Sequence, residues 1–119
     1  MRIMVIGASA NRSKFGNKAV RAYLRQGHDV FPVNPHEQEI EGLHVCQSVS
    51  DVPGPIGRAT IYLHQEQAMI VLRELAARGD IAELWLNPGA DSPEVVKLAR
   101  ELGFEPIQAC SIVDIGERP

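Results

Sequence analysis

The apolar residues of this chain fall into short blocks with two alternating spacings. One kind of block is a short, largely apolar run closed by glycine, proline or a polar residue, which is typical of a strand buried on both faces of a parallel sheet. Blocks of this kind predict strands at Ile3–Ile6, Val30–Val33, Ala59–Leu63, Ile81–Leu86 and Phe104–Ile107.

The other blocks carry apolar residues at helical spacing. From Phe15 to Gln26 the apolar side chains recur every three or four residues, and an unbroken stripe of the same kind runs from Ala68 to Ala76. A third helix is predicted with Ser92 as its N-cap and Pro93 at its first position. Each helix is followed by a glycine suited to a left-handed C-terminal conformation, and these are Gly27, Gly79 and Gly103.

Strands that alternate with helices of this length favour a parallel sheet with right-handed crossovers. The predicted fold is α/β and Rossmann-like: a doubly wound, mostly parallel sheet of five to six strands with helices on both faces. Leu43–Val49 predicts the sixth strand, at an edge, and Ser50–Pro55 holds too much proline and glycine for regular structure. The 119 residues predict a single domain, 1–119.

Composition and charge exclude several classes of function. A net charge of -3 gives no overall attraction to nucleic acid or anionic membrane, so neither partner is expected. The two cysteines, Cys46 and Cys110, predict free thiols, and the lack of a signal-peptide core or a long apolar stretch predicts a cytoplasmic protein. The histidines lack metal-ligand spacing and the aspartates are scattered, so we expect no metal site and no catalytic residues.

The loop after the first strand has the chemistry of a phosphate site. In open α/β sheets, ligands bind beyond the carboxyl ends of the strands where the strand order reverses. This loop enters the first helix with small residues, hydroxyls, free backbone N–H groups and two cations. The residues predicted to contact a ligand here are Gly7, Ala8, Ser9, Asn11, Arg12 and Lys14.

The motif does not match the common nucleotide fingerprints. The glycine positions of a dinucleotide Gly-x-Gly-x-x-Gly motif hold Gly7, Ser9 and Arg12, and no P-loop pattern is present. The second predicted strand ends in Asn34-Pro35-His36, without the acidic residue that an NAD site needs for its ribose. That neutral-to-basic end suits a ribose that carries its own phosphate.

Several blocks, taken in order along nearly the whole chain, carry a family resemblance. They are Val5-Ile6-Gly7-Ala8-Ser9, Tyr23–His28, Val30-Phe31-Pro32-Val33-Asn34-Pro35, Ile40-Glu41-Gly42, Ser50-Asp51-Val52-Pro53 and Trp85-Leu86. With them the chain resembles the stand-alone coenzyme A (CoA)-binding domain family, which is similar to the N-terminal domain of the succinyl-CoA synthetase alpha chain.

The resemblance implies a CoA site made of three loops. It places Gly7-Ala8-Ser9 against the phosphates, Val33-Asn34-Pro35 near the adenosine and Asn87-Pro88-Gly89 beside the ligand. His64 is a further candidate contact, because it follows a buried strand at its carboxyl end. The chain departs from the family at Leu63-His64, where members often carry Phe-Arg, and at Gln108-Ala109, where Asp-Arg often precedes the late cysteine.

These observations predict a CoA or acyl-CoA binding protein, a small ligand-binding module without catalysis of its own, with CoA as its cofactor. Two alternatives stay open. One is an NAD(P)-binding redox or sensor domain, and the other is a CoA-binding subunit of a larger acyl-CoA ligase or transferase. The expected partner is a small-molecule ligand, and a homo-oligomer or a partner enzyme subunit also remains open.

Overall fold

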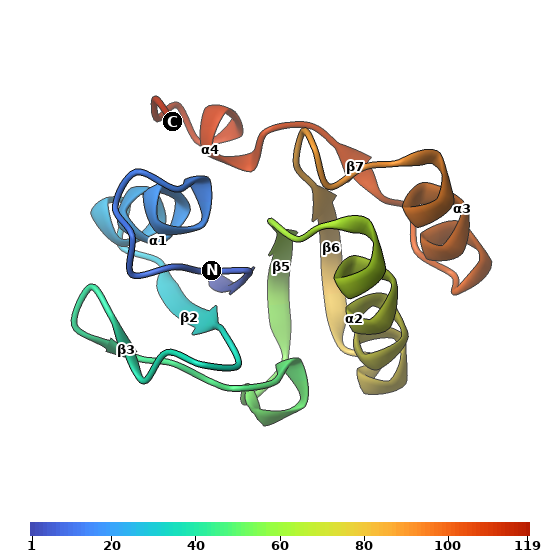
Figure 1. Ribbon diagram of the computed structural model, residues 1–119, viewed down its shortest axis with the longest axis horizontal. Coiled ribbons are helices and arrows are strands. Elements are labelled where there is room, and N and C mark those ends of the chain that lie inside the picture. Colours follow the sequence, from blue (N-terminus) through green and yellow to red (C-terminus); the bar gives the residue numbers. More distant parts are fainter.

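A computed structural model describes residues 1–119 and places five parallel strands in one sheet (Figure 1). The strand order is β2-β1-β5-β6-β7. The strands are β1 (Arg2–Ile6), β2 (Asp29–Val33), β5 (Ile56–Ile61), β6 (Ile81–Leu86) and β7 (Ile107–Gln108). Two short strands, β3 (Glu39–Ile40) and β4 (Leu43–His44), form a separate antiparallel hairpin.

Helices cover both faces of the sheet. Figure 1 shows α1 (Phe15–Arg25) and α4 (Ser111–Asp114) on one side, and α2 (Gln65–Arg78) and α3 (Pro93–Glu101) on the other. A short 3-10 turn, η1 (Val49–Asp51), packs against α2. No helix is both long and apolar enough to cross a membrane.

The core lies in two layers, one on each face, because successive strand residues point to opposite sides. Ile3 and Val5 of β1 pack under α1 with Ala19, Val20 and neighbouring residues. Met4 and Ile6 point the other way, into the layer under α2 and α3. All four of these side chains are at most 1% exposed, which explains why Ile3–Ile6 is apolar at every position.

The strand order fixes where a ligand site can lie. From β1 the chain passes through α1 to β2 on one side of β1, and later returns to build β5, β6 and β7 on the other side. The order therefore reverses between β1 and β5, whose following helices lie on opposite faces. The loops at the carboxyl ends of these two strands diverge and leave a crevice between them.

The α/β class, the parallel sheet and the helices on both faces are confirmed, and the sheet has five strands. The predicted edge strand at Leu43–Val49 is wrong: only Leu43–His44 is extended, it pairs with β3, and Cys46 alone bridges to Val33 of β2. The last strand is shorter and later than Phe104–Ile107. The η1 turn begins at Val49 and runs into Ser50–Pro55, the stretch expected to be irregular.

A buried arginine, Arg58 of β5, ties the C-terminal segment to the sheet. It is 6% exposed, and its guanidinium donates to Glu83 and Asp114 at 2.9 and 3.0 Å and lies 4.3 Å from the centre of the Trp85 ring. Burial alone would lower the pKa of Arg58, but hydrogen bonds with Tyr23 and Asp114 outweigh it and raise the pKa. The ion pair with Asp114 thus holds α4 over the sheet.

Candidate functional site

Two glycines allow the β1–α1 loop to lie close to the backbone at the crevice between β1 and β5. Gly7 has a φ of 85°, and a Cβ there would lie 2.3 Å from the carbonyl oxygen of Tyr62, just after β5. A Cβ at Gly16, in the first turn of α1, would lie 2.2 Å from the Gly7 carbonyl oxygen. Only glycine permits both approaches, so the loop, the end of β5 and the start of α1 meet closely here.

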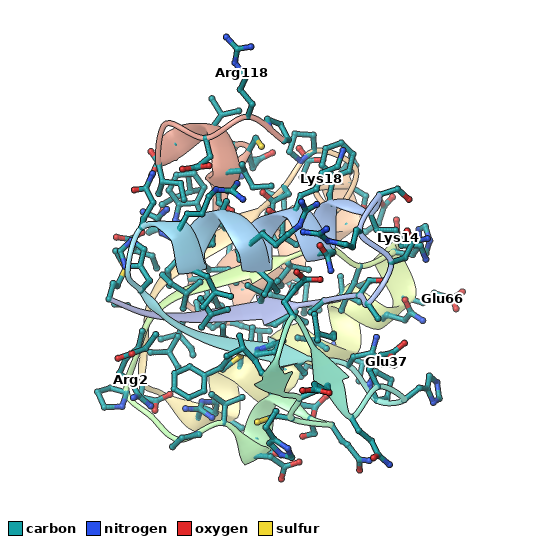
Figure 2. The ribbon with its side chains drawn as sticks, turned by 90° about the vertical axis from the view of Figure 1, so that its left-hand side faces the viewer. Arg2, Lys14, Lys18, Glu37, Glu66 and Arg118 are labelled. Carbon is teal, nitrogen blue, oxygen red and sulfur yellow. The ribbon has the colours of Figure 1, made fainter.

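Both helices that start at this crevice lack a capping side chain. Lys14 at the N-cap of α1 and His64 at the N-cap of α2 make no side-chain cap hydrogen bond, whereas Ser92 caps α3 through the Val95 amide. Uncapped first-turn N–H groups, at the positive end of the helix dipole, suit an anion. Figure 2 shows Lys14, Glu37 and Glu66 at this same edge of the molecule.

The polar side chains of the β1–α1 loop divide into two groups. Ser9 and Asn11 shape the loop, because Ser9 Oγ accepts from the Asn11 amide at 3.0 Å and Asn11 Oδ1 accepts from the Ser13 amide at 3.0 Å. The cations remain outside: Lys14 is exposed and makes no ion pair, and the Arg12 side chain is 66% exposed. The two cations are therefore accessible to a ligand.

The end of β2 is bound directly to this loop. Asn34 Nδ2 donates to the Ala8 carbonyl at 2.9 Å, and the Val33 carbonyl accepts from the Gly7 and Ala8 amides, each at 3.3 Å. Asn34 Oδ1 accepts from the amides of His36 and Glu37, so the side chain also stabilises its own turn. Ala8 and Val33 are buried and Asn34 is half-buried, while Pro35 is exposed beside them.

The loop after β6 is held in place by the buried side chain of Asn87, which is therefore not available to a ligand. Asn87 is 2% exposed, and its Nδ2 donates to Thr60 Oγ1 at 2.6 Å and to the Ile61 carbonyl at 3.0 Å. Its Oδ1 accepts from the Ser111 amide at 2.9 Å. Pro88 and Gly89 are exposed, so only these two members of the predicted Asn87-Pro88-Gly89 group face solvent.

The structure thus brings together the β1–α1 loop, the end of β2 and the end of β5, where His64 is exposed. Sequence reasoning missed Gly16, which permits the close approach, and Asn17, which is fully buried and donates to the Ser9 carbonyl at 2.9 Å. It also missed Glu41, whose carboxylate reaches Arg12 from the β3–β4 hairpin. No pattern of spacing marks the last two, because both contacts join separate elements.

A large hollow of the surface lies elsewhere. It measures about 980 Å³ and runs along the outer side of β2 and the β3–β4 hairpin, over Phe31, Leu43 and Cys46. Its charged lining is acidic, with Glu37, Glu39 and Asp51. An anionic ligand is disfavoured there, so the candidate site is assigned by the chemistry of its residues and not by the volume of a hollow. No group of His, Cys, Asp and Glu side chains could hold a metal ion.

Behind the crevice, burial raises the pKa of Tyr62 to about 12, and hydrogen bonds with Ser111 and Thr60 oppose this only in part. An ordinary tyrosine titrates near 10. Between these values the folded protein keeps the proton that the unfolded chain loses. The stability linked to Tyr62 is therefore complete below pH 10 and lost as the pH rises toward 12.

Between about pH 10 and pH 12 we expect the free energy of unfolding to fall more steeply in the wild type than in Tyr62→Phe. The difference in slope should reach up to about 1.4 kcal/mol per pH unit. Urea unfolding of both proteins between about pH 9 and pH 11.5 measures the difference. A gap between the two proteins that stays constant with pH would contradict the expectation.

With this geometry in place, comparison with known proteins decides the family. The CoA binding domain family matches residues 1–116. The chain belongs to this CoA-binding domain family. The resemblance seen in the sequence is confirmed.

Two relatives show the range of the CoA-binding domain family. An uncharacterised protein of Bacillus subtilis, YneT, is 26% identical over 86% of this chain and 75% of its own length. The alpha subunit of an ADP-forming acetate–CoA ligase II of Pyrococcus furiosus is 29% identical over 86% of this chain, which corresponds to 24% of that subunit.

A solved structure agrees with the fold. A conserved hypothetical protein from Pyrococcus furiosus is 31% identical, with a TM-score of 0.84 over 95% of this chain and 97% of its own. The chain is therefore similar in extent to small proteins of this fold and spans about a quarter of the ligase subunit.

Proposed function

We propose that residues 1–119 form a single domain that binds CoA or an acyl-CoA at the carboxyl edge of the sheet, between β1 and β5. The observation that carries the proposal is the β1–α1 loop of a CoA-binding domain, with an uncapped helix start and two accessible cations, Arg12 and Lys14. CoA presents a pyrophosphate and a ribose phosphate, and such groups bind well where helix N–H groups and cations converge.

The residues at the end of β2 support the proposal that the adenosine of CoA lies beside them. Asn34 links this end to the phosphate loop, so a ligand that lies against the loop passes beside Pro35. The β2 turn itself, Asn34-Pro35-His36, carries no carboxylate. A ribose with its own phosphate meets less repulsion there than it would beside the acid of an NAD site.

The remaining part of CoA, the pantetheine arm, is uncharged and needs only an accessible surface, without charged partners. The exposed Pro88 and Gly89 after β6 and the exposed His64 before α2 lie along the same edge of the sheet. The proposal assigns these residues to the arm by position. No residue in it is assigned a catalytic role.

Isothermal titration of the purified, reduced protein with CoA tests the proposal. We expect saturable binding that weakens for dephospho-CoA, which lacks the ribose phosphate, and weakens further for NADP. Lys14→Gln is expected to lower CoA affinity about fivefold, since a charge-assisted contact with phosphate is lost. Lys97→Gln, which removes an exposed lysine of α3 from a surface pair with Glu101, is the matched control and should leave affinity unchanged.

No heat with CoA from folded protein would rule out the proposed ligand. Tighter binding of NADP than of CoA would favour the NAD(P)-binding alternative instead. A second candidate function, a CoA-binding subunit that works with a partner chain, is supported by the match to only 24% of the acetate–CoA ligase subunit. It shares the same CoA site and differs only in what the bound CoA is used for.

A further inference from the structure

The turn between β3 and β4 holds one residue in an unfavourable backbone conformation. Glu41 and Gly42 form this two-residue turn with φ values of 48° and 79°, and Glu41 is the only non-glycine residue with a positive φ. Turns of this kind favour Asn, Asp or Gly at the first position. A strained residue that persists in a fold is a reason to ask what its side chain does.

The Glu41 carboxylate reaches across to the candidate phosphate loop. Its Oε2 accepts from Asn17 Nδ2 at 3.2 Å and lies 3.5 Å from Arg12 Nε. The two partners differ sharply in freedom: Asn17 is fully buried, whereas the Arg12 side chain is 66% exposed. The carboxylate is thus anchored on the helix side and holds an exposed guanidinium on the other.

The same cluster holds the loop backbone. Asn17 Nδ2 also donates to the Ser9 carbonyl, and Arg21 donates to Asn17 Oδ1 at 2.7 Å and to the Arg12 carbonyl at 2.8 Å. The loop backbone therefore keeps its shape when the Arg12 side chain moves. Only the guanidinium of Arg12 is left to choose between the Glu41 carboxylate and another anion.

We propose that Glu41 is an intramolecular competitor for the phosphate of the ligand, holding Arg12 in the absence of the ligand and giving it up when a phosphate arrives. This inference rests on the proposed CoA site and concerns its regulation. After the exchange, Glu41 stays on Asn17 as a negative charge that has lost its Arg12 partner, beside the bound phosphate. Like charges in proximity repel, so the carboxylate weakens anion binding.

Titration of Glu41→Gln with CoA and with inorganic pyrophosphate tests the proposal. The amide keeps an oxygen for Asn17 Nδ2 but loses the charge. We expect both anions to bind at least about threefold more tightly than to the wild type, with a smaller gain at high salt. Glu39→Gln is the matched control, because it removes the same charge from the same hairpin and Glu39 makes no ion pair. Its affinities should stay within a factor of about two.

An Arg12→Gln background separates competition from general repulsion. Without the guanidinium there is nothing to compete for, so Glu41→Gln should then raise affinity by less than twofold, about the limit of a surface charge effect. An equal gain with and without Arg12, or weaker binding by Glu41→Gln, would overturn the inference.

The titration with pyrophosphate keeps the test of Glu41 distinct from the test of the proposed function. If CoA gives no heat with either protein, the proposed ligand fails. Pyrophosphate still reports on Glu41 in that case: tighter binding to Glu41→Gln that depends on Arg12 supports the competition, and unchanged binding, including none, overturns it.

Discussion

Gly7→Ala is expected to lower the free energy of unfolding by at least about 3 kcal/mol and to abolish ligand binding. The added Cβ would sit 2.3 Å from the Tyr62 carbonyl oxygen, and the φ of 85° is itself unfavourable for alanine. Because the opposing atom belongs to the backbone, no side-chain rotation relieves the clash. Either β1 and β5 separate at their carboxyl ends or the loop leaves the crevice. Urea unfolding followed by circular dichroism measures the loss.

Gly27→Ala is the matched control for this prediction. Gly27 ends α1 with a φ of 79°, and nothing lies within 4 Å of the position of its Cβ. Gly27→Ala should therefore cost only the unfavourable backbone conformation of alanine, about 1 kcal/mol of the free energy of unfolding. The difference between the two variants isolates the close approach of β1 to β5. Equal losses in both would show that the crevice tolerates a methyl group and that the assigned packing is wrong.

Asn87→Leu is expected to lower the free energy of unfolding by about 3 kcal/mol, although leucine has a similar volume. The substitution leaves the Thr60 hydroxyl, the Ile61 carbonyl and the Ser111 amide without the partner that the Asn87 side chain supplies. Ser111 is fully buried, so water does not replace the lost bond to its amide. The main consequence should be release of α4 from the sheet.

Gln108→Leu makes the same amide-to-leucine change at an exposed position of β7 and serves as its control. It should alter the free energy of unfolding by no more than about 0.5 kcal/mol. If the two variants lose stability equally, the buried hydrogen bonds of Asn87 do not hold the C-terminal segment. Thermal unfolding of both proteins, with far-ultraviolet circular dichroism to check helix content, decides between these outcomes.

The candidate site was predictable from sequence only in its local parts. The loop from Gly7 to Lys14 is one continuous stretch between a strand and a helix, so its small residues and cations are visible together. Asn34 was expected near the adenosine, and the structure shows its side chain bonded to Ala8 and to its own turn. Asn87 was expected beside the ligand, and its amide is buried under Ser111.

By itself, the sequence determined the alternation of strands and helices, the three glycines that end helices and the family of the domain. These depend on hydrophobic periodicity and on backbone freedom, which act over a few neighbouring residues. Only the tertiary structure decided the strand order, the β3–β4 hairpin in place of an edge strand, the short α4 and the contact of Glu41 with Arg12. Each of these joins segments distant along the chain, where packing, hydrogen bonding and charge outweigh local propensity.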